Sequence, residues 1–128
     1  MAPPVGPYTP VVRAGSFLVC SGQLGLADGA LEDGVPAQVA QAVRNLGALL
    51  AGEGAGLSDV VKTTVFLVDM ADYPAMNDAY VAAFGDHRPA RSAVAVAGLP
   101  LGALVEIEAW ALAPGGDDGS AGSATSAG

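Results

Sequence analysis

The sequence predicts an α+β protein in which two helices cover one face of a mixed β-sheet, with elements in the order β-β-α-β-α-β-β. Two segments, residues 36–54 and 72–85, carry apolar side chains at helical spacing. Runs of strand-forming residues lie before, between and after them. A chain of 128 residues is long enough for one folded core but not for two, and 52% of its residues are hydrophobic.

A hairpin is expected at the start of the chain. Residues 11–13 and 17–20 are short apolar runs, and the Ala-Gly-Ser sequence between them is typical of a tight turn. Glycines then recur through residues 22–34, which predicts a glycine-rich loop before the first helix.

The first helix is expected to open at Pro36 and to end at Gly54, because proline is favoured in the first turn and glycine after the last. Its apolar positions recur at helical spacing: Val39, Val43, Leu46 and Leu50. Residues 62–70, rich in β-branched side chains, predict the next strand.

The second helix is expected to be capped by Asp72 and ended by Gly85. One face of it carries Tyr73, Met76, Tyr80 and Phe84. Two further strands are predicted near residues 92–97 and 103–112.

The last predicted strand places charged side chains where a core strand is expected. Alternation puts Val105 and Ile107 on one face, and Glu106, Glu108 and Trp110 on the other. Charges are seldom buried without a partner or a task. A polar face that also carries a tryptophan indicates a subunit interface or a cleft.

Composition limits the domain organisation and the surroundings of the protein. Residues 5–113 are expected to form the folded domain, and residues 114–128 a disordered tail rich in Gly, Ser and Ala. No apolar run is long enough to span a membrane, and the first residues lack the features of a signal peptide. The single cysteine, Cys20, has no partner for an internal disulfide, so a cytoplasmic location is expected.

The charge of the chain limits the partners that it is expected to bind. The formal net charge of -8 leaves no basic track for a nucleic-acid backbone, so nucleic-acid binding is not expected. Charged residues make up only 14% of the chain, a low value for a small monomer. Some surface is therefore expected to be buried against other subunits.

Arg91 and Glu106 are the candidates for chemistry. Arg91 follows Pro89-Ala90, and its planar guanidinium suits a carboxylate; alternatively it pairs with Glu106 or Glu108. A partly desolvated Glu106 would have a raised pKa useful for proton transfer; alternatively it is a solvated side chain.

Three further residues have two interpretations each. Tyr8 could cover a pocket or pack on the sheet edge, and Ser21 could bind a ligand or local backbone. His87, with no cysteine or histidine cluster beside it, is expected in a surface or capping role and not in a metal site.

Several motifs together resemble those of the RidA (YjgF) family. The resemblance covers essentially all of residues 5–113. Its motifs are Gly6-Pro7-Tyr8, Cys20-Ser21-Gly22-Gln23, Asp59-Val60-Val61-Lys62-Thr63-Thr64-Val65-Phe66, Met76-Asn77-Asp78-Ala79-Tyr80, Pro89-Ala90-Arg91-Ser92 and Val105-Glu106-Ile107-Glu108-Ala109.

The resemblance implies a chorismate-mutase-like fold and a homotrimer with a central barrel and ligand sites in clefts between subunits. It also implies a hydrolytic deaminase, a 2-iminobutanoate/2-iminopropanoate deaminase, that converts reactive 2-imino (enamine) acids to 2-oxo acids and ammonia. No cofactor and no metal are expected.

The resemblance also implies roles for individual residues. Arg91 would hold the substrate carboxylate, and Glu106 would position or activate water. Tyr8 would line the pocket, with Ser21 and Gly22 near the bound acid. Many members carry Cys where this chain has Ala93; the contribution expected there is that of the main-chain carbonyl, which alanine keeps.

Three other functions are alternatives to the deaminase. A non-catalytic carboxylate-binding protein is the first alternative, and Arg91 favours the enzyme over it. An RNA-cleaving translation inhibitor is less favoured because of the net charge of -8. A chaperone that uses exposed apolar surface is neither supported nor excluded by the sequence.

Overall fold

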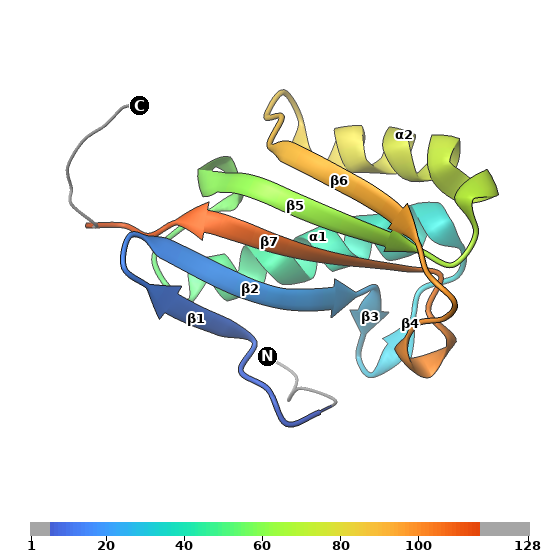
Figure 1. Ribbon diagram of the computed structural model, residues 1–128, viewed down its shortest axis with the longest axis horizontal. Coiled ribbons are helices and arrows are strands. Elements are labelled where there is room, and N and C mark those ends of the chain that lie inside the picture. Colours follow the sequence, from blue (N-terminus) through green and yellow to red (C-terminus); the bar gives the residue numbers. More distant parts are fainter. Residues whose placement is uncertain (1–5, 116–128) are drawn as a thin grey trace.

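A five-stranded mixed sheet organises residues 6–115, the part of the chain that the computed structural model describes (Figure 1). In chain order the strands and α-helices are β1 (Val11–Ala14), β2 (Phe17–Leu24), β3 (Leu26–Ala27), β4 (Ala30–Leu31), α1 (Val35–Ala51), β5 (Val60–Leu67), α2 (Tyr73–Phe84), β6 (Ala90–Ala95) and β7 (Val105–Leu112). The mixed α+β fold predicted from the sequence is confirmed.

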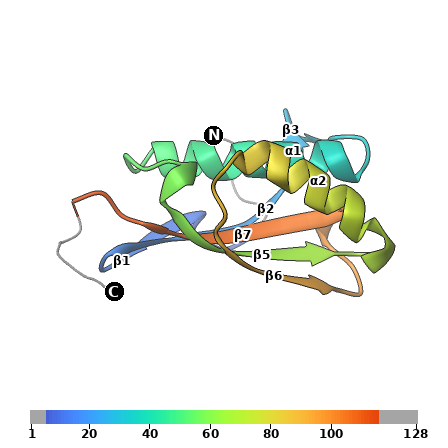
Figure 2. The ribbon, with the colours of Figure 1, turned by 90° about the horizontal axis from the view of Figure 1, so that it is seen from above.

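The strand order in the sheet is β1-β2-β7-β5-β6, so the last strand of the chain lies at its centre. The β5–β6 pair is parallel and is joined through α2, whereas the other neighbours are antiparallel. Both helices cover the same face of the sheet, and no helix of the described residues covers the opposite face, here called the open face (Figure 2).

The core lies between the helices and the sheet. Side chains of β7 alternate as expected: Val105 and Ile107 are fully buried, whereas Trp110 on the open face is 44% exposed. Leu46 and Leu50 of α1 fill the other side of this core. Because apolar burial is the main stabilising contribution, this one contiguous core holds both layers together.

The predicted glycine-rich loop is partly wrong. β2 continues to Leu24 through a bulge after Cys20, and β3 and β4 then form a small hairpin. Gly25 serves close packing: a Cβ there would lie 2.5 Å from the Cα of Gln38, so only glycine lets this strand end meet α1.

The start of the second helix also differs from the expectation. The strand predicted to reach Met70 ends at Leu67, and a short 3-10 helix, Met70–Asp72, precedes α2. Asp72 occupies the cap position of α2 but makes no side-chain capping bond. Asp69 instead caps the 3-10 turn, its Oδ1 accepting a hydrogen bond from the Ala71 amide at 2.9 Å.

The ends of the predicted domain and tail fall outside the description: residue 5 and residues 116–128 are not among the described residues. Within residues 6–115, no helix combines the length and apolar character needed to cross a membrane.

Candidate functional site

Arg91 lies on β6, the edge strand beneath α2. The register aligns it with Thr63 of β5, which is aligned with Ala109 of β7. Thr63 and Ala109 are fully buried on the helix side of the sheet. The strand register therefore directs the Arg91 side chain toward α2 and away from the open face.

Three residues of α2, here called the α2 cradle, surround the guanidinium of Arg91: Tyr73, Met76 and Tyr80. The Nη2 group donates a hydrogen bond to the Tyr73 hydroxyl at 3.0 Å, and Nη1 donates to the Met76 sulfur at 3.7 Å. The guanidinium carbon lies 4.9 Å from the centre of the Tyr80 ring and 5.5 Å from that of Tyr73. Within residues 6–115, hydrogen bonds and cation–π attraction hold this charge, and no carboxylate pairs with it.

A buried hydrogen bond to Thr63 holds Tyr80 in place. The two hydroxyl oxygens lie 2.7 Å apart. Burial raises the pKa of Tyr80, although the Thr63 hydrogen bond and the charge of Arg91 oppose this. The ring under Arg91 is therefore neutral and held in one orientation.

Glu106 of β7 lies on the open face and packs directly against Gly22 of β2. A Cβ on Gly22 would come within 2.7 Å of the Glu106 carboxyl carbon, so glycine leaves the space that the carboxylate occupies. Burial, and secondly the neighbouring charge of Glu108, raise the pKa of Glu106. The structure thus brings together Gly22 and a glutamate with the perturbation expected of a proton-transfer group.

Ser21 holds the N-terminal segment that carries Tyr8. The Ser21 hydroxyl donates to the carbonyl of Thr9 at 2.7 Å, and its amide donates to the carbonyl of Pro10 at 2.8 Å. Local backbone, one of the two partners considered for this serine, is therefore the one observed. Tyr8 itself is 42% exposed.

Arg91 and Glu106 lie on opposite faces of the sheet within one chain. The strand register gives this result, and it contradicts the alternative in which Arg91 pairs with Glu106 or Glu108. Ala93, two residues along β6, packs against the core on the same side as Arg91. Four of the predicted site residues thus fall into two groups on opposite faces, here called half-sites: Arg91 with Ala93, and Gly22 with Glu106.

The surroundings of Cys20 and His87, two other potentially reactive side chains, are typical of residues with a structural role. Burial, with a smaller contribution from Glu53, raises the pKa of the Cys20 thiol to about 11, as fits an inert core cysteine. His87 is half-buried, and its Nε2 lies 2.7 Å from the carbonyl of Val60. No metal-binding cluster of His, Cys, Asp and Glu occurs within residues 6–115.

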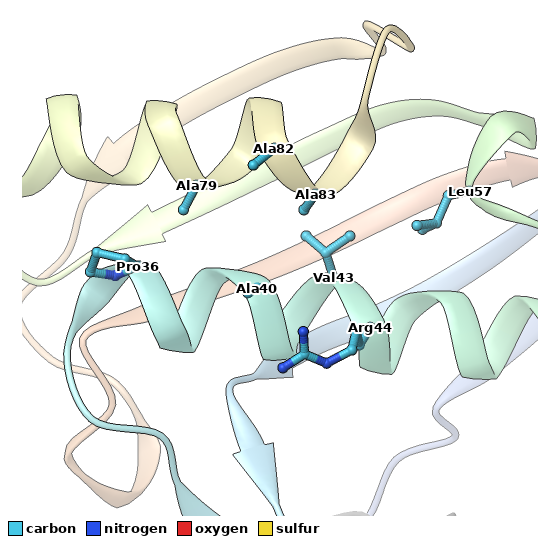
Figure 3. A pocket seen from close by; sticks show the side chains of 8 residues that line it. All are labelled: Pro36, Ala40, Val43, Arg44, Leu57, Ala79, Ala82 and Ala83. Carbon is cyan, nitrogen blue, oxygen red and sulfur yellow. The ribbon is translucent and has the colours of Figure 1, made fainter.

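A groove of about 440 Å³ runs between the two helices (Figure 3). Its lining is apolar apart from Arg44, and it includes neither Arg91 nor Glu106. The lining residues are Pro36, Ala40, Val43, Arg44, Leu57, Ala79, Ala82 and Ala83.

The α2 cradle was missed as a functional element. Tyr73, Met76 and Tyr80 follow helical spacing, and this pattern indicated only a core-facing stripe. What distinguishes them is the arginine that β6 places beside them. An arginine two residues after a proline, following a helix with tyrosines seven positions apart, was the available signal.

The fold and the two half-sites define a small α+β protein with a carboxylate-compatible arginine on one face of the sheet and a perturbed glutamate on the other. A family model described as Endoribonuclease L-PSP matches residues 1–113. The chain belongs to this family, which is the RidA family.

Relatives with known names include mouse 2-iminobutanoate/2-iminopropanoate deaminase, 43% identical over 111 residues that make up 84% of this chain and 82% of the mouse protein. The crystal structure of RidA from the Antarctic bacterium Psychrobacter sp. is 39% identical, with a TM-score of 0.83 over 86% of this chain and 91% of that one. The crystal structure of Escherichia coli TdcF with bound serine is 34% identical, with a TM-score of 0.81 over 85% of this chain and 90% of that one.

Proposed function

We propose that this protein hydrolyses 2-imino acids to 2-oxo acids and ammonia in a site completed between two subunits of a homotrimer. The observation that carries the proposal is the guanidinium of Arg91. Its side-chain partners among residues 6–115 are a tyrosine hydroxyl and a thioether, so it is charged and positioned without being neutralised by a carboxylate. A substrate carboxylate is the natural partner for such a group. Relatives at about 40% identity that carry deaminase names support the reaction.

The chemistry needs little more than orientation and one water. With its carboxylate on Arg91, the imine presents its electrophilic carbon to water held by Glu106. The Glu106 carboxylate takes one proton from the water as the C–O bond forms and returns it to nitrogen, which gives the carbinolamine. Glu106 then takes the proton of the carbinolamine hydroxyl and passes it to nitrogen, so the C=O bond of the 2-oxo acid forms as the C–N bond breaks and ammonia leaves. A glutamate with a raised pKa is a better base for this step than an ordinary one.

A second subunit is required because the half-sites face away from each other. Arg91 of one subunit and Glu106 of another would meet in the cleft between them, with Tyr8, Ser21 and Gly22 beside Glu106. Exposed apolar side chains on the open face, among them Trp110, support burial at such a contact.

The test is an imine-trapping assay with Arg91→Ala. An amino-acid oxidase or dehydratase generates 2-iminobutanoate, semicarbazide traps what is not hydrolysed, and adduct formation is followed with and without the protein. We expect wild type to suppress the adduct and Arg91→Ala to lose about 100-fold in kcat/KM, because a charged hydrogen-bonding pair is worth about 3 kcal/mol.

Arg88→Ala is the matched control, since the hydrogen bonds of its guanidinium go to the carbonyls of Gly85 and His87 and not to side chains of the α2 cradle. Wild-type suppression of the adduct should persist in this variant. Equal activity of wild type and Arg91→Ala would refute the proposal. Binding of 2-oxobutanoate without faster hydrolysis would instead identify a non-catalytic carboxylate-binding protein.

A further inference from the structure

The two tyrosines of the α2 cradle use their hydroxyls differently. The Tyr80 hydroxyl is hydrogen-bonded to Thr63, so Tyr80 contacts Arg91 through the face of its ring. The Tyr73 hydroxyl accepts the hydrogen bond from Nη2 of Arg91 at 3.0 Å. Tyr73 therefore offers the guanidinium both a ring and an oxygen atom.

These contacts restrain the guanidinium in different ways. Attraction to an aromatic ring holds the charge near the ring but does not set the direction of any one N–H bond. A hydrogen bond from one terminal nitrogen fixes the direction in which that nitrogen donates. A guanidinium has five N–H donors, and a bidentate carboxylate takes two of them, so the donor given to Tyr73 leaves enough for a ligand.

We propose that Tyr73 is a positioning residue whose hydroxyl fixes the orientation of the Arg91 guanidinium for the carboxylate of the substrate. This inference rests on the role given to Arg91 under the proposed function. The sulfur of Met76, 3.7 Å from Nη1, is a weak acceptor and does not replace the tyrosine oxygen.

Tyr73→Phe isolates the hydroxyl because it keeps the ring. For 2-iminobutanoate we expect KM to rise about fivefold, equivalent to the net worth of about 1 kcal/mol for one hydrogen bond. The kcat should change by less than about twofold, since the lost contact orients the bound carboxylate and not the water. Tyr73 is 36% exposed, so the melting temperature should remain that of the wild type.

Val81→Ala is the control for a general effect on the helix, because Val81 is 45% exposed on α2 and is not part of the cradle. Its KM and kcat should equal those of the wild type. Tyr73→Leu, which removes the ring as well, should raise KM further than Tyr73→Phe. A purely structural role would move the melting temperature and kcat without this graded rise in KM.

Titration with 2-oxobutanoate, measured by calorimetry, separates failure of this inference from failure of the proposed function. If the wild type hydrolyses imines and Tyr73→Phe leaves both KM and 2-oxobutanoate affinity unchanged, the positioning role is wrong and the function stands. If no hydrolysis occurs but affinity for 2-oxobutanoate falls about fivefold in Tyr73→Phe, the positioning role stands alone. A wild type that neither hydrolyses imines nor binds 2-oxobutanoate overturns both.

Discussion

At the scale of single residues, Glu106 acquires its character from its surroundings. It lies against Gly22, where no Cβ competes for the space, and beside a second carboxylate on the same face. Burial contributes more than the charge of Glu108 to the raised pKa of Glu106, but Glu108→Gln removes that charge and keeps the size of the side chain. This difference makes its contribution measurable.

Glu108→Gln should shift the acidic limb of the pH profile of kcat/KM to lower pH. Removing the neighbouring negative charge makes ionisation of Glu106 easier, which lowers its pKa, and the base then becomes active at a lower pH. Imine-trapping assays across a pH series measure the shift. Glu53→Gln, an exposed charge at the end of α1, should leave the limb in place. A limb that moves to higher pH in Glu108→Gln would contradict this account of Glu106.

Sequence patterns reached some of these residues and not others. Alternation along residues 105–112 placed Glu106 and Glu108 on one face, and the structure confirms this. Residue chemistry makes Arg91 and Glu106 candidates for carboxylate binding and proton transfer, and the family resemblance assigns them a reaction. The contact between Arg91 and Tyr73 could not be read from spacing, because it depends on how β6 pairs with β5 beneath α2.

At the scale of elements, α2 carries the cradle, so the turn that starts this helix matters for the site. Two aspartates precede it, and only Asp69 makes a capping hydrogen bond. The sequence favoured Asp72 because it stands immediately before the helical pattern. The 3-10 turn between the two aspartates, which shifts the cap three residues earlier, left no separate signal.

Asp69→Ala should lower the free energy of unfolding by about 1 kcal/mol, the usual cost of losing a side-chain cap. Asp72→Ala should cost less, because only a favourable charge near the helix N-terminus is removed. Urea denaturation followed by circular dichroism compares the two variants. A larger loss in Asp72→Ala would show that the capping assignment is wrong.

The strands also differ in how far nearby residues alone predict their boundaries. The hairpin at residues 14–16 and both long helices were predictable because turn residues and helical spacing are local signals. The extension of β2 to Leu24 was not, because its bulge is defined by pairing with β7, about ninety residues later. Glycines that permit close packing and glycines that permit turns look alike in a sequence.

At the scale of the whole molecule, one chain presents two half-sites on opposite faces of a single sheet. The helix side offers a positioned cation, and the open face offers a perturbed carboxylate among exposed apolar side chains. A charged fraction of only 14% agrees with a chain that buries surface against copies of itself. The central claim is therefore that catalysis belongs to the assembly and that each active site takes Arg91 and Glu106 from different subunits.

Subunit complementation tests this claim most directly. Arg91→Ala and Glu106→Gln chains, each inactive alone, are co-expressed with different tags and purified through both tags to give hybrid trimers. Every hybrid then contains one cleft with both residues intact, so we expect roughly one third of wild-type activity in the imine-trapping assay. Hybrids that form stable trimers but remain as inactive as either parent would contradict a site shared between subunits.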